Sequence, residues 1–324
     1  MSRGLHFYSE MLRIRYFEEA AIRGMKEQLV LGAIHPSIGQ EAVAVGVCAN
    51  LEKTDVVLST HRGHGHTLAK GAQLAPMMRE LFGKQGGYCG GKGGSMHIAD
   101  FSVGMLGANG VVGANIVIAT GAAHAIRLRR SHEIVVCFFG DGATNRGPFL
   151  EGLNWAGVHR LPILYVCENN GFAATTRTTA LSAGEGPAAR ARSLGIDGAD
   201  IDGNDVLAVD KVAAGLVAEI RGGGGPRFLH VRTYRLTGHT AADTAPYRTR
   251  SEVEERLRDE PIGRLRAHLL REEGVTDAVL EATARSTREA VDAAYADARD
   301  APYPPAASAF DDVQDVGDPR LEAY

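Results

Sequence analysis

Polar residues suited to binding metal and phosphate follow two apolar segments of the chain. Asp141 stands between two glycines directly after the apolar run 133–139, and Asn170 ends the run Glu168-Asn169-Asn170 after the apolar run 163–167. A carboxylate and an amide oxygen are ligands that Mg²⁺ uses together with substrate phosphates and water. The pair therefore predicts a Mg²⁺ site at Asp141 and Asn170, with the backbone carbonyl of Phe172 as a third ligand and a diphosphate completing the shell.

Two other phosphate-binding motifs fit the sequence less well. Gly140-Asp141-Gly142 could begin a nicotinamide-binding fingerprint, but that pattern requires glycine where Asn145 stands. That fingerprint would also direct the Asp141 carboxylate at the pyrophosphate. The two negative groups repel each other unless a cation lies between them. The glycine-rich run 86–94 is not a Walker loop, since Gly93 occupies the position that needs Ser or Thr. A lone Gly-Asp-Gly turn more often has a structural role than a ligand-binding one. The same turn followed by Glu-Asn-Asn is a more specific sign of a metal and diphosphate site.

Alternating apolar segments indicate the elements that must position these residues. Helices are expected at 5–29, 40–51, 76–82, 114–130, 144–159 and 205–221, with two more to about 300, and strands at 56–59, 133–139, 163–167 and 227–234. The helix 114–130 is rich in alanine and is expected to be buried. The segment 173–195 is low in bulky apolar residues and is expected to be a mobile loop.

The strand–helix–strand unit over 133–167 predicts a parallel sheet. We therefore expect an α/β, doubly wound fold with a mainly parallel sheet flanked by helices. Ligands of such sheets bind beyond the carboxyl ends of the strands. His61-Arg62, Gly140–Gly142, Glu168–Asn170 and the run 235–239 all follow predicted strands, so we expect them to converge there.

Composition excludes several classes of protein. The chain has 324 residues, 44% hydrophobic and 23% charged, which is typical of a globular protein, and its net charge of −4 does not indicate nucleic-acid binding. No apolar stretch is long enough to cross a membrane. The cysteines, at 48, 89, 137 and 167, form no Cys-x-x-Cys pair and indicate free thiols. These features predict a cytoplasmic protein.

Several motifs in order carry a resemblance to a known family. They are Gly39-Gln40-Glu41-Ala42, Thr60–Gly65, Lys92–His97, Gly110–Gly113, Gly140–Gly142, Glu168–Asn170, Thr233–Arg235, Gly238-His239 and Tyr247–Arg250. With them the chain resembles the α subunits of the decarboxylating component of pyruvate, branched-chain 2-oxo acid and acetoin dehydrogenase complexes. That family uses thiamine diphosphate and Mg²⁺, and this chain resembles the diphosphate-binding half of its fold.

The resemblance implies a role for each matched residue. Those expected to bind the cofactor are His61, Arg62, Gly110, Val112, Asp141, Gly142, Ala143, Asn170, Phe172 and Arg235, and those expected to act in catalysis are His239 and His35. The two arginines would bind the diphosphate, for which a planar guanidinium is well suited. Gly110 and Val112 would contact the aminopyrimidine through their backbone, and Gly142 and Ala143 would offer N–H groups to the diphosphate.

The resemblance also implies a reaction and partners. The enzyme would cleave a C–C bond of a 2-oxo acid or acetoin and pass the acyl unit to a lipoyl group. Its activating glutamate would belong to a pyrimidine-binding domain on a separate β subunit, in a heterotetramer, and a lipoyl acyltransferase is a further expected partner. Residues 1–300 would form one thiamine diphosphate-binding domain, and 301–324 a proline-rich acidic tail.

Two alternatives stay open from the sequence. A transketolase-like carboligase shares the same half of the fold, and a non-catalytic cofactor-binding protein could retain it. The substrate also stays open, because Leu236–Thr240 and Ala245-Pro246 depart from the pattern typical of pyruvate dehydrogenases. The runs 60–66, 96–101 and 168–173 look most like acetoin dehydrogenase α subunits, which favours acetoin.

Overall fold

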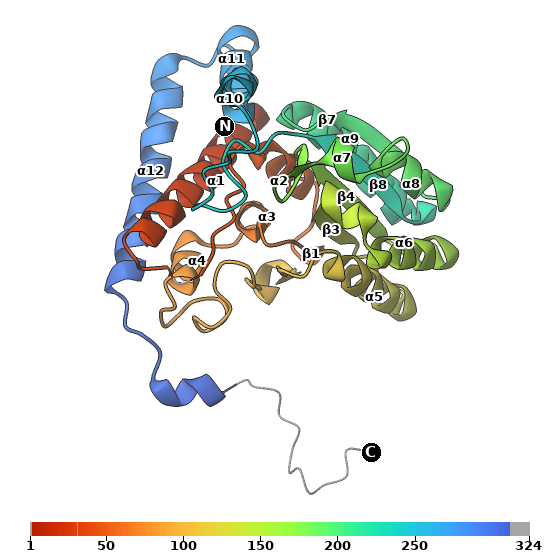
Figure 1. Ribbon diagram of the computed structural model, residues 1–324, viewed down its shortest axis with the longest axis horizontal. Coiled ribbons are helices and arrows are strands. Elements are labelled where there is room, and N and C mark those ends of the chain that lie inside the picture. Colours follow the sequence, from red (N-terminus) through yellow and green to blue (C-terminus); the bar gives the residue numbers. More distant parts are fainter. Residues whose placement is uncertain (1, 31, 312–324) are drawn as a thin grey trace, which may run out of the picture.

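A six-stranded parallel sheet lies at the centre of the fold (Figure 1). The computed structural model describes residues 2–30 and 32–311. The strand order is β2-β1-β3-β4-β8-β7, and a separate antiparallel pair joins β5 to β6. The strands are β1 Val56–Leu58, β2 Met105–Gly107, β3 Val135–Gly140, β4 Ile163–Asn169, β5 Phe172–Ala173, β6 Thr176–Arg177, β7 Gly198–Asp202 and β8 Arg227–Arg232. This architecture confirms the predicted α/β fold class.

Helices cover both faces of the sheet. They are α1 Arg3–Lys26, α2 Glu41–Cys48, α3 Gly63–Ala69, α4 Leu74–Leu81, α5 Ala114–Arg129, α6 Gly147–His159, α7 Thr178–Leu181, α8 Pro187–Ser193, α9 Val206–Glu219, α10 Arg250–Leu257, α11 Pro261–Glu272 and α12 Asp277–Asp300. Shorter turns are η1 Phe101–Val103, η2 Asp141–Asn145, η3 Ile220–Gly224 and η4 Ala306–Phe310. None of the helices described is both long and apolar enough to cross a membrane.

The alternation of side chains along β3 explains the layers. Val135, Cys137 and Phe139 pack against α5 and α6, whereas Val136 and Phe138 pack against α2 and α9. Such alternation is the period of two that a strand imposes. A third cluster joins α1, α4, α11 and α12 beside this sheet, and α1 and α12 lie side by side (Figure 1).

The register of β3 and β4 brings two predicted ligands to one edge. Gly140 pairs with Glu168 in parallel register, so Asp141 and Asn170 both follow the carboxyl ends of neighbouring strands. The predicted strand–helix–strand unit is therefore confirmed, with α6 as its helix. Because η2 precedes α6, the helix begins at Gly147, three residues later than the sequence indicates.

Two predictions about elements were wrong. The segment 173–195 holds the β5–β6 pair, α7 and α8 in place of an irregular loop. The helix α5 is buried along one face only, and Ile118 on its other face is 46% exposed. A further helix, α3, was not predicted: it begins in the polar run from Gly63 to His66, whose two histidines contact the buried carboxylates of Glu18 and Glu168. The proposed tail lies largely in 312–324, outside the described residues.

Candidate active site

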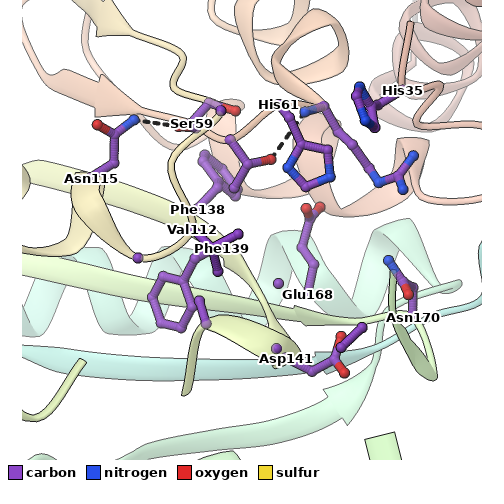
Figure 2. A pocket seen from close by; sticks show the side chains of 18 of the residues that line it. His35, Ser59, His61, Val112, Asn115, Phe138, Phe139, Asp141, Glu168 and Asn170 are labelled. Atoms are coloured by element: carbon purple, nitrogen blue, oxygen red, sulfur yellow. Dashed lines mark hydrogen bonds between the residues drawn. The ribbon is translucent and has the colours of Figure 1, made fainter. Parts of the chain in front are cut away.

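A cavity of about 340 Å³ opens at the carboxyl edge of the sheet. The structure brings every predicted site residue to its wall: His35, His61, Arg62, Gly110, Val112, Asp141, Gly142, Ala143, Asn170, Phe172, Arg235 and His239. Asp141 and Asn170 lie on one side, His35 and His61 on the other, and Glu168 extends between them (Figure 2). The predicted convergence of strand-end residues is thus present in the fold.

Two buried arginines give the cavity its positive charge. Arg62 is 5% exposed and Arg235 is 1% exposed. Arg62 donates to the carbonyls of Pro36 and His239, at 2.8 and 3.0 Å, and Arg235 donates to the carbonyl of Ala174 and the hydroxyl of Tyr247, both at 2.8 Å. Within the part of the chain that the structure describes, neither guanidinium forms an ion pair with a carboxylate.

Two buried arginines in one cavity cost free energy when no ligand neutralises their charge. Burial, with a further contribution from Arg235, lowers the pKa of Arg62 to about 9. The Nε of Arg235 is buried and has no hydrogen-bond partner among the described atoms. Buried cations are normally paired, because desolvation of a charge is expensive. Two guanidiniums that face one cavity, with no carboxylate partner in the described part of the chain, therefore fit a dianionic or more highly charged ligand such as a diphosphate.

Asp141 and Asn170 supply the oxygen atoms expected of a metal site. The Asp141 carboxylate accepts from the hydroxyl of Thr178, and burial raises its pKa above the ordinary range. The Asn170 Oδ1 accepts from the N–H of Phe172 at 3.2 Å, and its amide donates to Gln40 at 3.1 Å. A buried carboxylate without a cationic partner is stabilised by a bound cation. The donor set fits Mg²⁺ held against phosphate oxygens.

A cluster of acidic, cysteine or histidine ligands is not the basis of this site. Among residues 2–30 and 32–311, no three His, Cys, Asp or Glu side chains come together as metal ligands. The predicted set has a single carboxylate, an amide and the Phe172 carbonyl. It would therefore depend on the oxygen atoms of a bound phosphate, as Mg²⁺ sites commonly do.

Three histidines line the cavity beside the arginines. The ring centroids of His35 and His61 lie 4.7 Å apart, and those of His35 and His239 lie 4.9 Å apart. Burial and the charge of Arg62 lower the pKa of His35 and of His239 to about 4, and that of His61 to about 2. All three rings are therefore neutral near pH 7, and each can donate one hydrogen bond and accept another.

The backbone also shapes the cavity. A Cβ atom on Gly142 would lie 2.8 Å from the Cβ of Ala173, so only glycine lets η2 approach β5 this closely. Gly110 and Val112 lie on the loop before α5, where Asn109 accepts from the N–H of Val111 at 2.8 Å. The Val112 side chain is 50% exposed, which leaves its backbone as the part that the fold holds at the cavity.

The loop after β8 is tied to the cavity by polar contacts. Asp243 accepts from the N–H of His239 at 2.6 Å and from the hydroxyl of Tyr247 at 2.7 Å. Arg248 donates to the carbonyls of Arg235, Leu236 and Thr237. These contacts set the direction of His239 toward Arg62, whose Nη2 lies 3.1 Å from the His239 Nδ1.

Sequence reasoning missed several residues of the cavity wall. They are Gln40, Ser59, Thr60, Met96, Asn115, Phe138 and Glu168 among others. Gln40 and Glu168 stand inside motifs that the sequence shows, so a role could have been assigned to them. Asn115 donates to the Ser59 carbonyl from α5, and Phe138 is a core residue of β3. No pattern in the sequence indicates these last two.

Comparison with known proteins identifies the family of the chain. The family model described as the dehydrogenase E1 component matches residues 9–307. The chain is 43% identical, over 96% of its length and 93% of the relative's, to the α subunit of acetoin:2,6-dichlorophenolindophenol oxidoreductase from Bacillus subtilis. It is 43% identical to the protein of the same name from Cupriavidus necator, over 78% of its length and 75% of that protein's.

A pyruvate dehydrogenase is also among the relatives. The E1 component subunit alpha of pyruvate dehydrogenase from Rhizobium meliloti is 38% identical, over 95% of this chain and 89% of that protein. The family match therefore spans nearly the whole chain and includes every residue of the cavity. The chain belongs to the dehydrogenase E1 component family.

Proposed function

We propose that the chain is the α subunit of a thiamine diphosphate- and Mg²⁺-dependent dehydrogenase that cleaves a C–C bond of acetoin or a 2-oxo acid. One observation carries the proposal. Arg62 and Arg235 are buried and have no carboxylate partner among residues 2–30 and 32–311, and they share a cavity with the Asp141 carboxylate, which has no cationic partner among the same residues. A magnesium diphosphate satisfies all three groups together, because it presents negative oxygen atoms to the arginines and a cation to the aspartate.

Each part of the cavity then has a task. Arg62 and Arg235 bind the diphosphate, with the N–H groups of Gly142 and Ala143 beside it. Asp141, Asn170 and the Phe172 carbonyl hold Mg²⁺. The backbone of Gly110 and Val112 contacts the aminopyrimidine. When bound, thiamine diphosphate supplies the nucleophilic carbon that makes cleavage beside a carbonyl group possible.

The histidines act on the substrate in this proposal. His35 and His239, neutral near pH 7 because burial lowers the pKa of each to about 4, orient the substrate through hydrogen bonds. His61 lies beside both rings, with its ring centroid 4.7 Å from that of His35 and 5.6 Å from that of His239. Neutral rings let the cavity hold a polar substrate without adding positive charge near the arginines.

Acetoin is the favoured substrate. Two relatives at 43% identity are named as acetoin-oxidising α subunits, and the pyruvate dehydrogenase relative is at 38%. The acyl unit would pass to a lipoyl carrier on an acyltransferase. The relatives named as α subunits support a β partner, which would supply the pyrimidine-binding domain and the activating glutamate in a heterotetramer.

The proposal extends to the rest of the chain. Residues 1–300 would make up one cofactor-binding domain, followed by a tail at 301–324 with prolines and acidic residues. A cytoplasmic location is supported by the free cysteines, three of which are buried thiols, at 48, 137 and 167. Burial raises the pKa of Cys48 to about 12, so this thiol is unreactive.

Two substitutions test the proposal. Arg235→Met should abolish calorimetric binding of thiamine diphosphate and also raise the melting temperature of the cofactor-free chain, because an unpaired buried cation is removed. Asp141→Asn should leave the fold intact and remove the dependence of cofactor binding on Mg²⁺. Arg232→Met, at an exposed arginine outside the cavity, is the control. Wild-type affinity in either cavity variant, with the β partner present, would show that the assignment is wrong.

A further inference from the structure

One buried amide of the cavity wall, on Gln40, is neither a proposed metal ligand nor a proposed cofactor contact. The Gln40 side chain is 3% exposed and lines the cavity. Its Oε1 accepts from the amide of Asn170 at 3.1 Å. Its Nε2 is buried and has no hydrogen-bond partner among residues 2–30 and 32–311. The contact with Asn170 is therefore the one that this side chain makes in the described structure.

The backbone around Gln40 is anchored to the end of the sheet. Gln40 is the N-cap residue of α2, but its side chain does not cap the helix as Ser, Thr, Asp or Asn usually does. Gly39 has a φ of +94°, and a Cβ atom there would collide with the carbonyl oxygen of Tyr234. The Gly39 carbonyl accepts from the hydroxyl of Thr233 at 3.0 Å. The start of α2 is thus held against the segment after β8, and the Gln40 side chain is left for Asn170.

A single backbone N–H fixes the orientation of both amides. The N–H of Phe172 can only donate, so the Asn170 atom that lies 3.2 Å from it is the oxygen Oδ1. The Asn170 Nδ2 then faces Gln40, and the Gln40 atom that accepts from it is Oε1. Two hydrogen bonds, one at each end, therefore prevent the Asn170 amide from turning over.

This orientation matters because Asn170 is an amide ligand. Both ends of the Asp141 carboxylate are oxygen atoms, so either can face a cation. An amide presents an oxygen in one orientation and an N–H group in the other, and the N–H group repels a cation. The Asn170 Oδ1 has two lone pairs, of which the Phe172 N–H uses one, so the second is left for a metal ion.

A buried amide elsewhere in the chain shows the pairing expected of a purely structural role. Asn204 is 8% exposed and does not line the cavity. Its Nδ2 donates to the carbonyl of Asp259 at 2.9 Å, and its Oδ1 accepts from the hydroxyl of Thr233 at 3.1 Å. Gln40 is paired at one end only, and a buried donor without a partner costs free energy that a leucine would avoid. The contact with Asn170 accounts for an amide at this position.

We propose that Gln40 is a positioning residue for the divalent-cation site, which holds the Asn170 amide so that its Oδ1 is available to the cation. The inference rests on the proposed function, in which Asn170 is a ligand of Mg²⁺. Hydrogen bonds that orient a metal ligand are general in metal sites, and their loss weakens metal binding by about 10- to 100-fold. Gln40 acts through Asn170 and is not itself a ligand.

The experiment uses the α chain with its β partner and measures binding without turnover. Calorimetric titration with Mg²⁺ at saturating thiamine diphosphate gives the Mg²⁺ concentration that half-loads the complex. For Gln40→Leu we expect this concentration to rise by about 10- to 100-fold. Gln40→Glu keeps an oxygen that accepts from Asn170, and its added negative charge favours a cation. Its Mg²⁺ requirement should therefore not exceed that of the wild type.

A second background separates orientation of the ligand from support of the fold. Asn170→Asp presents an oxygen to the cation in either orientation, so it does not need Gln40. Adding Gln40→Leu to Asn170→Asp should therefore change the Mg²⁺ requirement by less than about 2-fold, the usual limit for independent sites. A residue that only supports the fold would cost the same in both backgrounds.

A matched control lies just beyond the other end of α2. The Asn50 amide donates to the Asp210 carboxylate of α9 at 2.9 Å, away from the cavity. Asn50→Ala should lower the melting temperature and leave the Mg²⁺ requirement unchanged. If Asn170→Asp binds no Mg²⁺, the comparison of Gln40→Leu with Gln40→Glu still decides the matter.

The outcomes distinguish two failures. A Gln40→Leu complex with the Mg²⁺ requirement of the wild type would overturn this inference alone. An equal loss in the wild-type and Asn170→Asp backgrounds, or a raised requirement in Gln40→Glu, would overturn it too, since neither fits a role in orienting Asn170. A wild-type complex that binds thiamine diphosphate without any dependence on Mg²⁺, or not at all, would instead overturn the proposed function and this inference with it.

Discussion

Single residues of the cavity owe their properties to burial beside positive charge. The fold places three histidine rings around Arg62 and leaves each without a carboxylate partner in the described structure. The pKa of each ring therefore lies well below the unperturbed value of about 6.5. Glu18 and Glu168, by contrast, each hold a histidine outside the cavity, His64 and His66. Histidine thus occurs in two settings in this fold, beside a buried arginine in the cavity and beside a buried glutamate outside it.

The first prediction concerns the pH dependence of stability. The pKa values of His35 and His239 are about 4 and that of His61 about 2 in the folded chain, against about 6.5 unfolded. Below pH 6.5 the unfolded chain takes up protons that the folded chain does not. The free energy of unfolding should therefore fall as pH drops from about 6.5 toward 4, by at most about 1.4 kcal/mol per histidine per pH unit.

Unfolding by denaturant at several pH values measures this change in the free energy of unfolding. His61→Asn should reduce the slope below pH 6.5, whereas His97→Asn, at an exposed histidine, should not. Saturating inorganic pyrophosphate should also reduce the slope, because it neutralises the arginines and raises the pKa of the rings. An unchanged slope in His61→Asn would contradict the buried, neutral state of this ring.

The contacts between these residues could not be predicted from the sequence. The predicted cofactor-binding residues lie at the cavity because they follow strands, and parallel strands end at one edge of a sheet. The neutral state of His61 depends on Arg62, His35 and His239 together, and these come from three distant segments. The contact of Glu168 with His66 likewise depends on how α3 packs on β4, which no local pattern encodes.

At the scale of elements, short and irregular pieces were the hardest to predict. The strands β3 and β4 are apolar and buried, so their positions could be read from composition. The edge strand β7 has the sequence Gly-Ala-Asp-Ile-Asp, in which a partly buried residue alternates with an acidic one, and it gives a weak signal. The strand β2 has three residues, too few for any periodicity. Tertiary pairing, rather than local propensity, makes them strands.

The second prediction concerns the contact between η2 and β5. Gly142→Ala would place a Cβ atom 2.8 Å from the Cβ of Ala173, so the turn that carries Asp141 must shift away from Phe172. We expect a loss of about 1–3 kcal/mol in the free energy of unfolding, as overpacking usually costs. Binding of Mg²⁺ and cofactor should weaken as well, because the two metal-binding segments separate.

A compensating change provides the control. Gly142→Ala combined with Ala173→Gly removes the clash, so chemical denaturation and calorimetry should show both stability and binding largely restored. Gly140→Ala, whose Cβ would meet nothing closer than 4.0 Å, should be tolerated. If the double variant is no better than the single one, the close approach of these two segments is not the reason for the glycine.

At the scale of the molecule, the cavity is complete on one side only. The groups proposed to bind a diphosphate and a metal ion converge at the carboxyl edge of the sheet, but the loop that would contact the aminopyrimidine is exposed, with Val111 67% accessible. Large apolar side chains left exposed beside a binding site commonly mark a protein interface. The outer face of α5 adds Val117 and Ile118 to the same region of the surface. The exposed loop and the exposed apolar side chains of α5 both fit a site that a partner subunit completes.

The last prediction is that the chain is inactive alone and active with its β subunit. In the proposed function the chain supplies the groups for diphosphate and metal and the partner supplies the activating glutamate, so neither subunit would hold a whole site. Acetoin cleavage should therefore be absent from the purified chain and appear on mixing, followed with an artificial electron acceptor, with sedimentation showing a heterotetramer. Val112→Asp, at the exposed loop, should weaken assembly, whereas Glu281→Lys on the outer face of α12 should not. Full turnover by the chain alone would show that its cavity needs no partner, and the exposed valines would then need another explanation.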